Sequence, residues 1–173
     1  MIIHAGGMIG NGVAGPAGPQ GPSGITSVRR KSEVAFTGLS LVIPTTATNL
    51  INLIKALPHT GSFTPFFNTT TNKFAVFNNN STVTFKINIT GSWTGAAATR
   101  SMTVDFPGTI GNTLIASRDA AVTTDIVSLP TFFSVDAGGN LATNGSDITI
   151  KSNGATFTAT SIILIAEQMI PTT

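Results

Sequence analysis

The side chains that most often carry acid–base chemistry are few in this chain, with two histidines and seven carboxylates among 173 residues. General acid–base or nucleophilic catalysis requires such groups to act as a pair. One histidine, His4, lies near the N-terminus, the other, His59, follows Pro58, and no two acids share the spacing of a carboxylate pair. The acids are Glu33, Asp105, Asp119, Asp125, Asp136, Asp147 and Glu167. We therefore expect that the protein is not an enzyme.

The sequence also indicates no metal or cofactor site. The chain has no cysteine, which excludes thiolate ligands and disulfides. The segment 136–140 carries oxygen-bearing side chains, but Gly138 and Gly139 favour a turn over a calcium loop. No glycine-rich segment follows a strand and opens a helix, as a phosphate-binding loop would. We expect no cofactor.

A strict period of three dominates the sequence before residue 27. Glycine recurs at every third position, and proline follows three of these glycines. This period is typical of a collagen triple helix, in which three polyproline-type chains meet at an axis that accommodates only glycine. We interpret residues 12–26 as a short collagen-like stalk of three chains, with a flexible linker as the alternative. The predicted axis positions are Gly12, Gly15, Gly18, Gly21 and Gly24.

The segments on either side of the stalk differ in character. Residues 1–11 are apolar and glycine-rich, and exposed apolar side chains are costly in water unless a partner covers them. We predict an N-terminal anchor peptide here, with a disordered terminus as the alternative. Its anchoring side chains are Ile2, Ile3, Met8 and Ile9. Residues 27–31 contain a basic cluster, which we interpret as a collar that is either solvated or in contact with an acidic partner or phosphate groups.

Composition restricts the partners of the protein. Hydrophobic residues make up 41% of the chain and charged residues only 9%, against about 25% in typical domains. Such a surface suits a protein that is largely covered by copies of itself or by another shell. The net charge of +2 does not favour nucleic acid. No apolar run approaches the ~20 residues of a membrane span, and the N-terminus lacks a secretory pattern, so we expect assembly in the cytoplasm.

Residues 32–173 have the pattern of a β-rich head. Apolar and polar residues alternate over residues 83–89, as in a half-buried strand. Asn153 and Gly154 lie between two alternating runs and predict a β-hairpin. The predicted strands are 33–37, 39–43, 63–68, 73–77, 81–94, 100–106, 113–118, 126–135, 147–151 and 156–167.

One short helix is expected within this β pattern. Between residues 45 and 57, apolar residues recur at the spacing of one helical face. Thr46 or Thr48 would cap this helix, and Pro58 would end it.

The fold class that follows is all-β, an antiparallel β-sandwich and most simply a jelly roll. The run 161–166 is apolar on both faces of its strand. We therefore expect this strand to be covered by the core on one side and by neighbouring subunits on the other. Because the stalk requires three chains, the head is predicted to be a homotrimer.

A short collagen-like stalk before a β-sandwich resembles the globular heads of the first complement component and the tumour-necrosis-factor superfold. Residues 67–74 look like that family's hairpin before a central strand, and residues 157–165 look like its closing strand. The chain departs from the family in having no tyrosine. Its predicted helix is also foreign to the usual pattern, and the resemblance implies no ligand or calcium site here.

The same plan resembles trimeric fibre and spike proteins of bacteriophages. This resemblance implies a virion structural protein at the virion surface, a head or tail fibre anchored by its N-terminus in a capsid or tail protein. Its knob would serve host-surface attachment, with a host glycan or protein as partner, or capsid decoration. A bacterial or spore surface collagen-like recognition module is the alternative.

Overall fold

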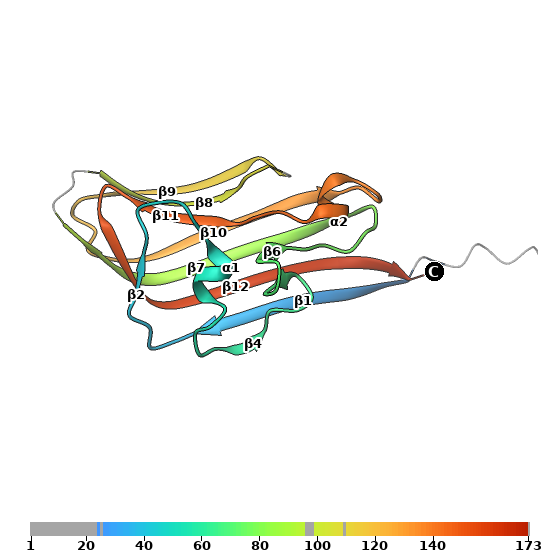
Figure 1. The fold of residues 1–173 in the computed structure, drawn as a ribbon, viewed down its shortest axis with the longest axis horizontal. Helices are drawn as coiled ribbons and strands as arrows, with labels where there is room; N and C mark the ends of the chain where they lie inside the picture. The colour runs from blue at the N-terminus through green and yellow to red at the C-terminus, as the bar shows by residue number, and fades with distance from the viewer. Residues whose placement is uncertain (1–23, 25, 96–98, 109, 173) are drawn as a thin grey trace, which may run out of the picture.

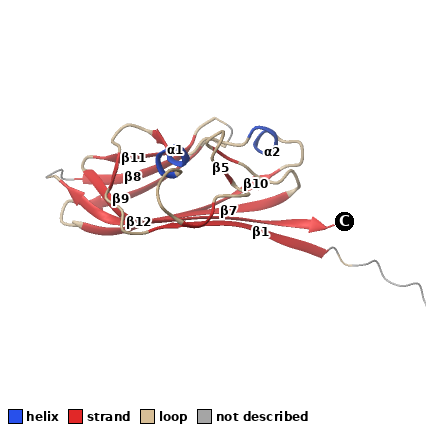
Figure 2. Ribbon diagram, turned by 60° about the horizontal axis from the view of Figure 1, so that its bottom comes forward, coloured by secondary structure: helices blue, strands red, loops and turns tan. Residues whose placement is uncertain are grey.

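Two antiparallel β-sheets stacked face to face make up most of the described chain, with a small two-stranded sheet and two short helices beside them (Figures 1 and 2). The computed structural model describes residue 24 and residues 26–95, 99–108 and 110–172. The predicted all-β antiparallel sandwich is therefore confirmed.

The larger sheet has six strands and contains both ends of the described chain. Its strands, in spatial order, are β10 (Thr124–Val135), β7 (Ser81–Thr94), β12 (Thr156–Thr172), β1 (Thr26–Phe36) and β4 (Thr60–Ser62), and β2 (Leu41–Ile43) also pairs with β12. β12 is the centre of this sheet, because it pairs with β7 along one edge and with β1 and β2 along the other.

The smaller sheet has four strands and lies against the larger one. Its strands are, in order, β3 (Thr48–Asn49), β11 (Thr149–Asn153), β8 (Thr99–Phe106) and β9 (Asn112–Asp119). A separate pair, β5 (Phe67–Asn68) and β6 (Lys73–Phe74), forms the hairpin expected from residues 67–74.

The hydrophobic core fills the space between the two sheets because strand residues alternate in direction. In β7, the apolar residues from Val83 to Ile89 are buried, while the residues between them face outward. The rings of Phe85, Phe106 and Phe133 pack edge to face at centroid distances of 5.0 and 4.8 Å. β7, β8 and β10 thus meet in one aromatic cluster.

The predicted helix is much shorter in the structure. α1 spans only Leu50–Ile54, and its N-cap is Asn49, whose Oδ1 accepts a hydrogen bond from the Asn52 backbone N–H at 2.9 Å. The proposed caps Thr46 and Thr48 were wrong, because Thr48 and Asn49 form β3 and pair with β11. A second helix, α2 (Asn140–Asn144), begins where the sequence indicated only a turn.

The predicted hairpin at Asn153 and Gly154 is wrong in its pairing. The chain does reverse there, and Gly154 has a φ of 74°, with the Thr99 carbonyl oxygen only 2.2 Å from where a Cβ would lie. However, β11 pairs with β3 and β8, whereas β12 belongs to the other sheet. The turn therefore connects the two sheets, because a turn signal reports reversal of the chain and not the partner of each strand.

Strand boundaries differ from the expected ones mostly at the ends. β7 has the predicted bounds, whereas β12 continues to Thr172 and pairs over its whole second half with β1. Residues 27–31, interpreted as a collar, lie in β1, and Thr26, assigned to the stalk, pairs with Thr172. Of residues 63–68, only Phe67–Asn68 form a strand, although Phe63 and Phe66 are buried.

Both ends of the described chain leave the sandwich at the same end, where β1 and β12 project as a two-stranded ribbon (Figures 1 and 2). Among the predicted axis glycines, Gly24 is described, and it is exposed. The predicted anchor and the other axis positions lie outside the described residues: Ile2, Ile3, Met8, Ile9, Gly12, Gly15, Gly18 and Gly21.

Candidate functional site

The outer face of the six-stranded sheet, the side turned away from the four-stranded sheet, gathers most of the exposed apolar side chains. Among the described residues, seven large hydrophobic side chains are exposed, and strand alternation places five of them on this outer face. These five are Val42, Ile126, Phe132, Ile163 and Met169. Large apolar side chains exposed on one face of a folded domain point to an interaction site.

Strand registers arrange the outer face in columns. A mostly apolar column on β10 and another on β12 flank a polar column on β7. The columns contain Ile126, Ser128, Pro130 and Phe132 on β10, then Thr84, Lys86, Asn88 and Thr90 on β7, then Ile163, Ile165, Glu167 and Met169 on β12. The outer face is therefore mixed, with polar side chains between large apolar ones.

A shallow groove of about 540 Å³ follows these columns, lined by Lys86, Pro130, Phe132 and Ile165 among others. Phe132 is 72% exposed, whereas its neighbour Phe133 is 7% exposed and belongs to the core. These two adjacent aromatic side chains therefore point to opposite sides of β10. A second, smaller groove at the edge of β10 includes Ile110 and also reaches Phe132.

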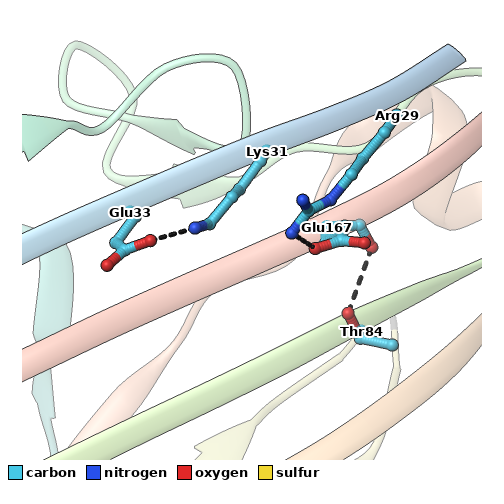
Figure 3. Close-up of polar contacts among 5 residues, drawn as sticks. All are labelled: Arg29, Lys31, Glu33, Thr84 and Glu167. Atoms are coloured by element: carbon cyan, nitrogen blue, oxygen red, sulfur yellow. Dashed lines mark hydrogen bonds and ion pairs between the residues drawn. The ribbon is translucent and has the colours of Figure 1, made fainter.

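Charged side chains occupy the part of the outer face nearest to the chain termini (Figure 3). Arg29 forms an ion pair with Glu167 across β1 and β12, and Lys31 forms one with Glu33 along β1. The hydroxyl of Thr84 donates a hydrogen bond to the Glu167 carbonyl oxygen at 3.3 Å. The hydrogen bond and the charge of Glu167 raise the pKa of the Arg29 guanidinium above its ordinary value. Two cations and two anions leave this region without net charge.

A second polar cluster closes the opposite end of the sandwich. Arg118 forms an ion pair with Asp125 at 2.8 Å, and the Trp93 indole N–H donates to the same carboxylate at 3.3 Å. The buried Arg100 guanidinium donates to the carbonyl oxygens of Val122 and Gly95 at 3.0 and 3.3 Å. These contacts connect the loops on either side of β8 and β9, which gives the cluster a structural role.

The histidine and the acids singled out by the sequence do not come together. The ring of His59 packs edge to face against Phe63 at a centroid distance of 4.9 Å, and its Nδ1 lies 2.9 Å from the Leu57 carbonyl oxygen. Across the described ranges, no three His, Asp or Glu residues are placed to hold a metal ion. At 136–139, the Gly139 N–H donates to the Asp136 carbonyl oxygen, as in a turn.

The sequence indicated one part of the outer face and missed another. The run 161–166, apolar on both faces, contains Ile163, which lies on the outer face and is 38% exposed. Phe132 and Ile126 were missed, because a strand with two adjacent aromatic residues does not reveal which of them points to the core. No helix in the described part of the chain is long and apolar enough to cross a membrane.

Residues 28–168 match the family described as Sf6-type phage tail needle knob or tip of some Caudovirales. The tail needle protein of Shigella phage Sf6 is 54% identical over 143 residues, which are 82% of this chain and 51% of that protein. The chain thus spans about half the length of this relative.

The solved structures with some similarity to the chain include two from viral particles. The vertex protein P5 of PRD1 has 14% identity and a TM-score of 0.45, with 86% of this chain and 99% of that chain covered. A chain from the capsid of the Helicobacter pylori bacteriophage KHP30 has 11% identity and a TM-score of 0.37, with 86% and 95% covered.

Proposed function

Because the chain belongs to the family of Sf6-type phage tail needle knobs or tips, we propose that its β-sandwich is the knob of a homotrimeric tail needle or fibre. The outer face of the six-stranded sheet is the surface that becomes buried between the three copies. The observation that carries this proposal is the concentration of exposed apolar side chains on that one face.

The family decides between the two classes that the sequence left open. A bacteriophage virion structural protein at the virion surface is confirmed, with the tail tip as its location. A bacterial or spore surface module is not favoured. The Shigella phage relative is a tail needle protein, which supports a structural role over an enzymatic one.

The path of the chain supports a stalk that enters the knob from one end. β1 begins at Thr26, directly after the glycine triplets, and the other chain end, Thr172, pairs with it. In this proposal the glycine triplets before Thr26 lead three chains into the knob as a triple helix, and residues 1–11 anchor them in a capsid or tail protein of the particle. The opposite end of the sandwich then faces away from the particle.

The end of the sandwich that faces away from the particle is well placed to contact the host surface. Three identical knobs multiply weak contacts, because each later contact is effectively intramolecular. The proposed partner is a glycan or protein of the host cell surface. Excess purified protein should then bind host cells and slow adsorption of intact particles, and absence of both effects would leave a decorative or stabilising role.

The trimer is tested by native mass spectrometry and sedimentation equilibrium of the full chain. We expect a species of three chains at micromolar concentration, because the apolar outer face and the triplet phase both require it. A monomer at that concentration would contradict the proposal. If the trimer stays associated after its collagen signal in circular dichroism is lost, the association lies in the knob.

A further inference from the structure

Lys86 lies in the middle of the outer face, in an apolar setting. It projects from β7, where Pro130 of β10 stands opposite it on one side and Ile165 of β12 on the other. The groove that contains Phe132 also includes Lys86. A lysine in this position is solvated in the single chain and loses its water when the face is covered.

Lys86 has no anionic partner among the described residues. The three ion pairs there join Arg29 to Glu167, Lys31 to Glu33 and Arg118 to Asp125. Removal of an ammonium group from water without a counter-charge is strongly unfavourable, and proteins pair such groups or leave them exposed. The nearest acid in the strand register, Glu167, is already paired with Arg29, so a covered outer face requires a further carboxylate for Lys86.

We infer that Lys86 forms an ion pair with a carboxylate of a second copy of this chain, an inference that rests on the proposed trimer. Contact of the outer face with its own equivalent would bring lysines together, and a threefold ring requires two different patches at each interface. The acids of the outer face, Glu33 and Glu167, are already paired. The partner carboxylate therefore lies elsewhere on the neighbouring sandwich.

Four described acids are outside these ion pairs: Asp105, Asp119, Asp136 and Asp147. They lie on the four-stranded sheet or in the connections next to it and to β10. Asp105 accepts a hydrogen bond from the Thr113 hydroxyl at 2.6 Å, and Ala121 N–H donates to Asp119 at 2.8 Å, so both are already bonded on the four-stranded sheet. Asp136 and Asp147 lie in connections between elements, so each interface joins the outer face of one copy to the flank of the next.

The test uses charge reversal in the full chain, with sedimentation and native mass as the readout. Lys86→Glu should raise the midpoint concentration of trimer assembly at least tenfold, because two carboxylates would then meet in a desolvated site. Lys151→Glu is the matched control on the four-stranded sheet, and it should leave the midpoint within about twofold. Far-ultraviolet circular dichroism checks that each variant keeps its fold.

The partner is identified by combining Lys86→Glu with Asp136→Lys or with Asp147→Lys, while Asp105→Lys and Asp119→Lys on the four-stranded sheet serve as controls. Restoration of the wild-type midpoint by one of the first two, and not by the controls, would establish the pair. An unchanged midpoint in Lys86→Glu, or dissociation that neither Asp136→Lys nor Asp147→Lys restores, would overturn the inference while leaving the trimer intact. A monomeric wild-type chain would instead overturn the proposed trimer itself.

Discussion

The outer faces of the two sheets are built from the same kind of strand but differ in what they present. The six-stranded sheet exposes isoleucine, phenylalanine, valine and methionine side chains, whereas the four-stranded sheet exposes mainly hydroxyl, amide and charged groups, with Ile115 as its large apolar exception. On the smaller sheet these groups bond to one another, as when the Asn153 amide donates to the hydroxyls of Ser101 and Thr103 at 3.0 Å.

This difference shows that the two faces are adapted to different surroundings. A face whose polar groups are satisfied among themselves and by water is stable when it is exposed. A face with several large apolar side chains gains free energy when it is covered, by about 25 cal/mol per Å² of apolar surface. The four-stranded sheet therefore faces solvent in the proposed trimer, and the six-stranded sheet faces its neighbours.

The largest effect is expected at two adjacent residues of β10, one in the core and one on the outer face. Phe133→Ala should lower the free energy of unfolding by about 3–5 kcal/mol, because it leaves a cavity in the aromatic cluster. Phe132→Ala, one residue away, should leave the unfolding of the single chain nearly unchanged and weaken association instead. Chemical denaturation and sedimentation of both variants distinguish the two roles. Equal loss of unfolding free energy in both would contradict the assignment of Phe132 to the outer face.

A charge on each outer face tests the comparison directly. Ile163→Arg should shift the full chain towards monomer, with a rise of roughly a hundredfold in the assembly midpoint, because the guanidinium would be buried without a partner. Thr149→Arg, on the outer face of the four-stranded sheet next to Asp105, should assemble as the wild type does. Size-exclusion chromatography over a dilution series gives the midpoints, and a trimeric Ile163→Arg would remove this face from the interface.

The smallest effect is expected at the charged region near the termini. Glu167→Gln removes the partner of Arg29, but the Arg29 side chain is 57% exposed and that of Glu167 is 30% exposed, so water screens the pair. Placed in the monomeric Ile163→Arg background, this substitution should leave the melting temperature unchanged within about 1–2 °C at physiological salt. A fall of more than about 5 °C would mean that the ion pair stabilises the single chain as well.

The sequence predicted the strands better than their partners. The bounds of β7 follow from regular alternation between two turn signals, which is a local property. The hairpin at Gly154 failed because the pairing of β11 and β12 depends on strands far away in the sequence. The predicted helix was shortened for a similar reason, since β3 takes up the residues expected in its first turn.

The outer face could be predicted from the sequence only where the pattern of a single strand reveals it. The last strand is apolar on both faces, so a second covering surface was expected from the sequence, and Ile163 lies on the outer face. The contribution of β10 could not be expected, because it depends on which of Phe132 and Phe133 points to the core. Lys86 was also not singled out, since its apolar neighbours come from two other strands.

The ribbon of β1 and β12 has a mechanical consequence for the proposed stalk. The eleven residues of β1 pair in continuous register with β12, from Thr26 opposite Thr172 to Phe36 opposite Ile162. A pull on the stalk acts along β1, whereas its hydrogen bonds run perpendicular to the strand. Such a load shears all of these bonds at once and does not open them one by one. In the proposed arrangement, the knob is joined to its stalk in the geometry that resists tension best when the particle and its target move apart.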